Sequence, residues 1–302
     1  MAFKYYAAAL FSFVVWGVFS LVLKPLSNYA ALDILTYRVA FAAVIIALIS
    51  LTFRYRITKT NISLIKSLAP KERIKIISAT IFSAIMLALN WYLYIYVMNA
   101  VSVNATSLAY LICPILTTVL AGVFLKEKLN LGQWVAVGMS VLACLMLSYG
   151  HFMDMLYSVV IALSYAIYLV VQKASTKLDK FFTLTLHILI SALFLLPLGL
   201  NTGEMVEHST LFFQYVLLIA VLFTIIPLFL NMFALKGLDS SVVGVLLYIN
   251  PIISFLLAIF YFNEDITLLQ GLAYGLIFLA VIVFNVAYLK AKRNIALKVI
   301  NE

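Results

Sequence analysis

The chain has 302 residues, of which 66% are hydrophobic and only 10% are charged. A soluble core of this length cannot hide so much apolar surface, so the composition excludes an ordinary soluble domain and indicates a membrane protein. A net charge of +9 would suggest nucleic acid in a soluble protein, but here the basic residues follow a loop pattern. We therefore expect a lipid bilayer around the protein and no nucleic-acid partner.

Ten apolar runs of about 20 residues follow one another along the chain, and this length crosses a ~30 Å hydrocarbon layer as a helix. A transmembrane barrel needs shorter segments of alternating polarity, whereas these runs are apolar all round. The sequence therefore predicts an all-α membrane protein with ten transmembrane helices. The runs cover residues 4–23, 31–53, 74–98, 101–125, 131–149, 155–171, 181–200, 212–235, 241–262 and 268–289.

The loops between these runs alternate in charge. Lys and Arg crowd residues 54–75, between the second and third runs, and more of them follow the fourth, sixth, eighth and tenth runs. Cytoplasmic loops of membrane proteins collect Lys and Arg, so this pattern predicts that both termini are cytoplasmic. The opposite loops hold Lys24 and the acids Glu204, Glu207, Glu264 and Asp265.

The chain repeats part of its own sequence. A shift of 137 residues (249 − 112 = 137) places 112–138 on 249–275 with ten identical residues, among them Pro114 on Pro251. Matches of Leu, Ile and Ala arise by chance in apolar sequence, so the polar and Pro matches decide the comparison. We expect two repeats of five helices each. The predicted units are 1–150, 151–290 and a cytoplasmic tail at 291–302.

The two repeats are expected to be inverted. Because five is odd, the second repeat must enter the membrane from the other side. The charges agree, since Lys126 and Lys128 flank Glu127 whereas the equivalent Glu264 stands beside Asp265. Such symmetry builds a substrate site near the midplane that faces either side alternately. A weaker shift of 149 residues (165 − 16 = 149) lays Trp16 on Tyr165, Lys24 on Lys173 and Arg38 on His187.

Four segments match a known family. They are "WGVFSLVLKPL" from Trp16, "LDILTYR" from Leu32, "NWYLYIYVMNAVSVNATSLAYLICPILTTVLAGVFLKEKL" from Asn90 and "LLYINPIISFLLAIFYFNED" from Leu246. With them, nearly the whole chain resembles the RarD branch of the EamA transporters, in the drug/metabolite transporter superfamily. The resemblance implies two inverted five-helix repeats in the plasma (inner) membrane. It also implies a permease, commonly an exporter, for small organic metabolites such as amphipathic or aromatic compounds.

Arg38 is the main candidate for substrate binding. It lies inside the second run, where an unpaired charge costs roughly 3 kcal/mol or more. In a cavity between the repeats, its planar guanidinium would hold a carboxylate or another anion through two hydrogen bonds. Alternatively, Arg38 pairs with Asp33 or extends to the outer interface.

Three further residues are candidates for coupling or gating. His187 matches Arg38 in the second repeat, and its imidazole can titrate near physiological pH or remain neutral and bonded to a neighbouring helix. Lys24 and Asp33 bracket the outer ends of the first two runs. They would form a gate pair or serve as solvated anchors.

Aromatic and amide side chains deep in the runs form a second set of candidates. A ring that faces a cavity offers stacking and a polar tip to an amphipathic substrate. Most rings in transmembrane helices instead serve packing or interface belts. We expect Tyr110 and Tyr248 to face one shared cavity. The predicted cavity residues are Trp16, Asn90, Trp91, Tyr94, Tyr110, Tyr248 and Asn250, together with Arg38.

Pro114 and Pro251 each withhold a backbone N–H inside a run and free a carbonyl one turn earlier. A kink at matching places would shape the helices and would also supply a hinge for alternating access. Glu127 is expected to be structural, through a nearby charge or the start of the next helix. The "GLAYG" segment, 271–275, offers a small-residue packing face and a homodimer seam.

The sequence leaves two rival functions beside a secondary carrier. A passive channel needs a continuous polar stripe, and a membrane-embedded enzyme or lipid-handling protein needs paired acids or a metal cluster. The chain has no Walker lysine loop, no HExxH and no GxSxG. We therefore expect no enzyme activity, no cofactor and no metal, and a small molecule as the substrate.

Overall fold

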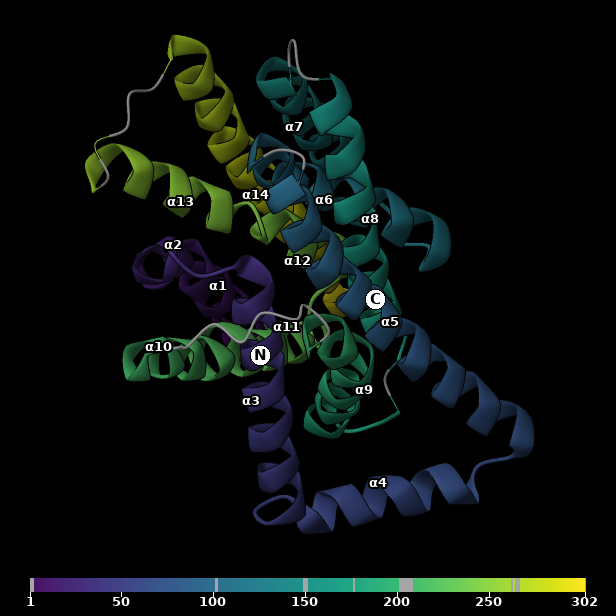
Figure 1. Ribbon diagram of the computed structural model, residues 1–302. Helices are drawn as coiled ribbons and strands as arrows, with labels where there is room; N and C mark the ends of the chain where they lie inside the picture. Colours follow the sequence, from purple (N-terminus) through teal and green to yellow (C-terminus); the bar gives the residue numbers. More distant parts are fainter. Residues whose placement is uncertain are drawn as a thin grey trace.

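The computed structural model describes residues 3–100, 103–148, 152–175, 177–200, 209–261, 263 and 267–301. Within these residues the chain forms a bundle of helices, without a β-strand (Figure 1). The helices are α1 (Phe3–Gly17), α2 (Phe19–Leu23), η1 (Lys24–Leu26), α3 (Ala31–Leu51), α4 (Tyr55–Ser67), α5 (Pro70–Ala100), α6 (Val103–Phe124), α7 (Leu131–Ser148), α8 (Phe152–Ala174), α9 (Lys180–Leu200), α10 (Thr210–Ala220), η2 (Val221–Ile225), α11 (Ile226–Ala234), α12 (Ser240–Leu246), α13 (Ile249–Phe260) and α14 (Leu268–Asn301).

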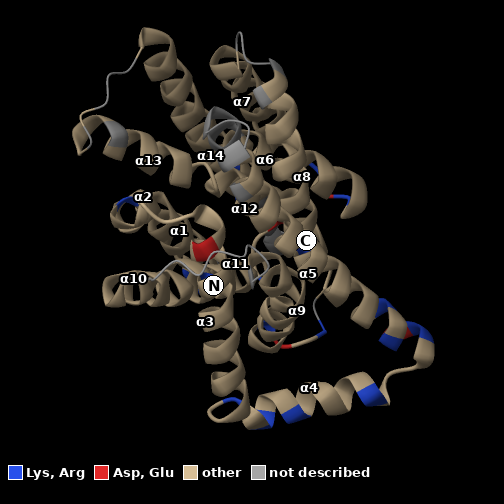
Figure 2. Cartoon of the chain, in the orientation of Figure 1, with Lys and Arg blue, Asp and Glu red and all other residues tan. Residues whose placement is uncertain are grey.

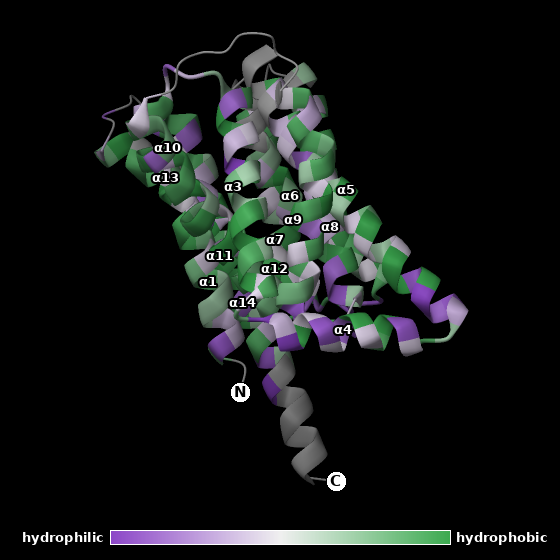
Figure 3. Ribbon diagram, turned by 60° about the horizontal axis from the view of Figure 1, so that its bottom comes forward, coloured by the Kyte–Doolittle hydropathy of each residue, from purple (hydrophilic) through white to green (hydrophobic). Residues whose placement is uncertain are grey.

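Nine helical segments of the described chain are long and apolar enough to cross a membrane. Each matches one of the predicted runs, and the run at 101–125 corresponds to α6, whose apolar part, Ala109–Phe124, is shorter. Figure 3 shows hydrophobic colour along the bundle and hydrophilic colour gathered at its ends, as a bilayer requires. The protein is therefore a multi-pass membrane protein.

Two lysines at one end of the bundle, Lys173 and Lys177, make contacts that join neighbouring helices. The Lys173 ammonium donates to the Leu235 and Leu238 carbonyl oxygens at 3.0 and 2.6 Å, which ties the end of α8 to the end of α11. Lys177 pairs with Glu72 at 2.9 Å and so ties the α8–α9 connection to the start of α5. A cation at a helix C-terminus satisfies carbonyls that have no partner within the helix.

The basic segment between the second and third runs is a helix rather than the loop expected from sequence. Lys and Arg lie along α4 and the start of α5 (Figure 2), and α4 lies across one end of the bundle (Figure 3). Two hydrogen bonds fix it there: Thr58 Oγ1 donates to the Ser50 carbonyl at 3.1 Å, and Asn61 Oδ1 accepts from the Asp179 N–H at 2.9 Å. Helix α4 is amphipathic, and helices of this kind are typical of membrane surfaces.

Glu127 joins the two halves at the same end. Its carboxylate accepts hydrogen bonds from the N–H groups of Ser240 and Ser241 at 2.7 and 3.0 Å and from the Ser241 hydroxyl at 2.6 Å. Glu127 therefore satisfies the first amides of α12, instead of the start of α7 that sequence suggested. Asn130 and Gln133 cap α7 by themselves through a reciprocal pair of bonds at 3.0 and 3.1 Å.

Two C-terminal expectations meet different outcomes. Helix α14 continues to Asn301, so the predicted tail at 291–302 begins as an extension of the last membrane helix. A Cβ built at Gly275 meets no atom within 4 Å, so this glycine is not required by packing within the chain. The homodimer seam at 271–275 stays a prediction. Four acids used for orientation lie outside the described residues: Glu204, Glu207, Glu264 and Asp265.

Candidate substrate-binding cavity

A π-helical turn, η2, supplies two of the contacts that build the cavity. Pro227 has no N–H, so the Phe223 carbonyl lacks its usual helical donor and instead accepts a hydrogen bond from Trp16 Nε1 at 2.9 Å. The extra residue of the turn also presents Thr224, whose hydroxyl accepts from Arg38 Nε at 2.8 Å. Single π-turns inside α-helices are frequent at functional sites, and this one links α1 and α3 to the second half of the chain.

A cavity of about 330 Å³ opens beside this turn, between helices of the two halves. A volume of this size suits a small organic molecule. The structure brings eight of the predicted site residues together on its wall. They are Trp16, Arg38, Asn90, Trp91, Tyr94, Tyr110, Asn250 and Pro251.

Arg38 is the only charged residue on the wall, so the described lining contains no carboxylate to neutralise it. Its guanidinium carbon lies 5.1 Å from the centre of the Trp91 ring, which is within cation–π range. Its hydrogen bond to Thr224 uses Nε, and it is the one hydrogen bond found between the guanidinium and the described residues. None of the described ion pairs joins Arg38 to Asp33. A guanidinium in this position is able to hold an anion through two hydrogen bonds.

Aromatic rings form the rest of the cavity wall. Tyr94 and Tyr110 lie 5.5 Å apart between ring centres, on α5 and α6. The ring of Trp16 meets that of Tyr165 edge-on at 6.2 Å. These two residues superpose in the weaker 149-residue shift of the sequence. Stacking and edge contacts of this kind suit a planar apolar substrate.

Asn90 holds the α5 side of the cavity in place. Its amide donates to the Ile161 carbonyl at 3.0 Å and to the Ser164 hydroxyl at 3.2 Å, both on α8. The side chain is only 6% exposed. Asn90 therefore positions the helix that bears Trp91, and its amide nitrogen is committed to protein partners.

Helix α13 closes the cavity from the other side through a close approach to α1. A Cβ added at Gly17 would lie 2.7 Å from Ile253 Cβ, so only glycine permits this spacing. Ser254 Oγ donates to the Gly17 carbonyl at 3.1 Å across the same contact. In Figure 1, α13 leads from α12 toward α1 and α2, and this path brings Asn250 and Pro251 to the cavity.

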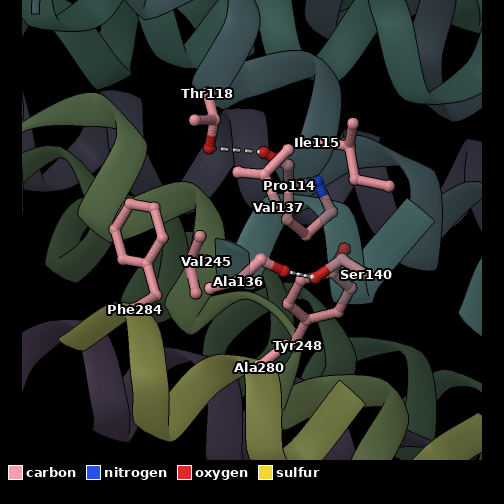
Figure 4. A pocket seen from close by; sticks show the side chains of 10 residues that line it. All are labelled: Pro114, Ile115, Thr118, Ala136, Val137, Ser140, Val245, Tyr248, Ala280 and Phe284. Carbon is pink, nitrogen blue, oxygen red and sulfur yellow. Dashed lines mark hydrogen bonds between the residues drawn. The ribbon is translucent and has the colours of Figure 1, made fainter. Parts of the chain in front are cut away.

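Tyr248 lies elsewhere, contrary to the expected shared cavity with Tyr110. It is buried beside Ser140 in a crevice that also contains Pro114 and leaves no room for water (Figure 4). The reason lies in the repeat register. Tyr110 is equivalent to Leu247 (110 + 137 = 247), and one residue further along a helix points about 100° away.

The two prolines differ in their surroundings. Helix α6 runs without interruption through Pro114, whereas the helix before Pro251 breaks between Leu246 and Ile249. The Leu247 carbonyl, which Pro251 leaves without its usual donor, accepts from the Asn250 N–H at 3.1 Å. A hinge role for both residues remains a prediction, and the break gives it a structural basis only at Pro251.

The coupling and gating candidates lie outside this cavity. His187 is fully buried on α9, with Tyr168 Oη 3.5 Å from its Nδ1 and Gln172 Nε2 3.4 Å from its Nε2. It lines a separate cavity between α5, α6, α8 and α9. Lys24 is exposed in η1, and Asp33 lies in the first turn of α3; neither of them lines the cavity.

Several wall residues were absent from the sequence prediction: Phe19, Ser20, Tyr165, Phe223, Ser254 and Tyr274. The Ser20 hydroxyl is buried and has no hydrogen-bond partner among the described residues. A signal existed for Tyr165, which the repeat places on Trp16. No signal in the sequence indicates Phe223 or its neighbour Thr224, because apolar periodicity does not reveal a π-turn.

Chemically, the cavity combines one cation, aromatic walls and a few hydroxyl and amide groups. It contains no paired acids and no nucleophile with a base, and the described residues hold no group of three metal-ligating side chains. It can bind an amphipathic molecule with an anionic group at Arg38. It offers no recognisable machinery for bond cleavage.

Comparisons with known proteins identify the family of the chain. A model of the EamA-like transporter family matches residues 3–149 and again 153–286. The chain is 30% identical over 286 residues to the uncharacterized transporter YojE of Bacillus subtilis, covering 93% of each chain. It is 29% identical to protein RarD of Streptomyces exfoliatus, covering 93% of this chain and 87% of the relative, and 26% identical to protein RarD of Escherichia coli, covering 91% and 92%.

The fold also occurs among solved structures. One crystal structure superposes with a TM-score of 0.73 over 95% of this chain and 97% of its own, at 14% sequence identity. Because the family model covers both halves and the relatives match nearly end to end, the chain belongs to the EamA-like transporter family, and its relatives include RarD proteins.

Proposed function

We propose that this protein is a secondary transporter that exports small amphipathic metabolites, with a preference for aromatic compounds bearing an anionic group. The single observation that supports this most is Arg38 in a cavity between the two halves, beside the Trp91 ring and with no acid on the described wall. An uncompensated cation in an aromatic cavity attracts an anion with a planar apolar body.

The transport cycle that we propose is alternating access between two inverted five-helix repeats. The double match of one family model supports the duplication, and the opposite charges around Glu127 and Glu264 support the inversion. Ten helices would span the plasma (inner) membrane, with α6 as the tenth and both termini in the cytoplasm. The basic end that contains α4 would face the cytoplasm.

Transport into proteoliposomes tests the proposal. Purified protein would be offered a mixture of aromatic acids, aromatic amines and neutral aromatics, with uptake read by mass spectrometry and by counterflow. We expect saturable counterflow of the acids. Non-saturating flux would indicate a passive channel instead, and chemical conversion of a compound without flux would indicate an enzyme.

Arg38→Gln tests the site itself. A charge-assisted hydrogen bond is worth about 1.5–3 kcal/mol, so the variant should lose about 10- to 100-fold in the apparent affinity for the acid. Neutral aromatics should change less. Arg56→Gln, at an exposed position of α4, is the matched control. If R38Q transports the acids as R56Q does, Arg38 does not bind the anion.

A further inference from the structure

A second and larger cavity lies at the basic end of the bundle. Its volume is about 710 Å³, and α5, α6, α8 and α9 enclose it. In Figure 1, the first part of α5, next to α4, runs away from α9. Further along α5, Ser191 Oγ of α9 donates a hydrogen bond to the Ala84 carbonyl of α5 at 3.1 Å and so joins the two helices. This size suits a drug-sized organic molecule.

The inner end of this cavity is polar and incompletely hydrogen-bonded. Ser83 and Gln172 line it and are each 1% exposed. The Ser83 hydroxyl and the Gln172 carbonyl oxygen have no hydrogen-bond partner in the described part of the chain. Buried polar groups of this kind are almost always paired, so two of them on one cavity wall indicate a ligand that donates a hydrogen bond there.

The outer end of the cavity is cationic. Glu72 and Lys177 neutralise each other at 2.9 Å, which leaves the ammonium of Lys75 as the net charge at the mouth. Lys75 and Ser83 are eight residues apart on α5, or about 12 Å along the helix axis. Between the two ends the wall is apolar, with Ile167 and Val171 of α8 among its residues.

The two cavities lie in series along the contact between α5 and α8. Ser83 borders one and Asn90 borders the other, about 10 Å apart along the same helix. Leu87, which is fully buried, and the Ser191–Ala84 hydrogen bond lie between them. A molecule bound at the basic end is therefore separated from the Arg38 cavity by about two helical turns of packed side chains.

We infer that the second cavity is a loading site, on the cytoplasmic side, for a hydroxylated aromatic carboxylate about 10–12 Å long. The hydroxyl donates to Gln172 or Ser83, the ring lies against the apolar wall, and the carboxylate meets Lys75. The word "loading" rests on the transport function proposed above, whereas binding at this cavity does not.

Thiol protection tests the binding without any transport. Ala79 lines the cavity, so A79C should react with the impermeant reagent 2-sulfonatoethyl methanethiosulfonate in nanodiscs. The buried Cys113 and Cys144 give the background rate in the unsubstituted protein. We expect 4-hydroxycinnamate to slow the modification of A79C at least fivefold, a factor that corresponds to ~80% occupancy. Cinnamate, without the hydroxyl, and methyl 4-hydroxycinnamate, without the carboxylate, should protect less at the same concentration.

Control variants separate this site from other effects. Lys66→Cys, exposed on α4, should react equally fast with and without 4-hydroxycinnamate. Ser83→Ala combined with Gln172→Leu should make 4-hydroxycinnamate and cinnamate protect A79C equally. R38Q should leave the protection intact, because Arg38 lines the other cavity.

The outcomes also separate this inference from the proposed function. No protection of A79C, or equal protection of K66C, overturns the loading site whatever the transport assay gives. Protection in a protein without saturable transport keeps the binding site and overturns its role in loading. Protection that R38Q abolishes assigns the ligand to the Arg38 cavity and overturns the second site.

Discussion

The contact of Glu127 with α12 should be among the strongest single ties between the two halves. Its carboxylate accepts three hydrogen bonds, from Ser240 N–H, Ser241 N–H and the Ser241 hydroxyl, at 2.6 to 3.0 Å. Glu127→Gln keeps one acceptor oxygen, removes the other and removes the charge that favours a helix N-terminus. With about 1.5–3 kcal/mol for a hydrogen bond to a charged group, the loss should be about 2–3 kcal/mol.

Thermal unfolding in detergent measures this loss directly. For a chain of this size, 1 kcal/mol corresponds to about 2 °C or slightly more, so E127Q should melt about 4–6 °C lower. Cys113 and Cys144 are buried and unpaired with each other, and they become reactive only when the bundle opens. A thiol-reactive fluorophore therefore reports unfolding without any added label.

Glu72→Gln is the matched control for this prediction. Glu72 pairs with Lys177 at 2.9 Å, but both side chains are about half exposed, so the pair is worth less than about 1 kcal/mol. Ser241→Ala should fall between the two variants, since it removes only the bond from the hydroxyl. If E127Q melts at the same temperature as E72Q, the three bonds to Glu127 do not hold the halves together.

Two further predictions concern the cavity wall. Gly17→Ala should destabilise the protein by about 1–3 kcal/mol in the same melting assay, because the new methyl meets Ile253 at 2.7 Å. Adding Ile253→Ala to this variant should restore most of the loss. A G17A protein that melts like the parent would exclude the close packing of α1 on α13. Trp16→Phe should lower the free energy of unfolding by about 1 kcal/mol, because it loses the hydrogen bond to the Phe223 carbonyl. Trp134→Phe, at an exposed position, should change it by almost nothing. Equal melting temperatures of the two variants would contradict the hydrogen bond of Trp16.

The sequence predicted the membrane class and most helix positions because the bilayer imposes one strong and local rule. Each run had to be apolar over about 20 residues, and nine such helices stand where the runs predicted them. The same rule does not detect an amphipathic helix with many polar residues, so it predicts a loop where the structure has α4. Its residues are polar on one side and need no long apolar run.

The cavity was partly predictable for a related reason. Charge, amide and aromatic groups are costly or conspicuous inside an apolar run, and seven of the residues predicted on that ground line one cavity. Tyr248 and His187 were chosen on the same ground but lie elsewhere, Tyr248 in a tight crevice and His187 in the other cavity. Residue type indicates that a polar group needs a partner, but it does not indicate which neighbour supplies one.

The sequence by itself determined that the chain is a multi-pass helical membrane protein with an internal repeat and a few polar groups in its spans. The tertiary structure decided which of those groups meet. The direction of a side chain changes by about 100° per residue along a helix, so a one-residue offset separates Tyr110 from Tyr248. The π-turn before Pro227 and the close approach at Gly17 depend on contacts between α1 and distant helices, and local sequence does not encode those contacts.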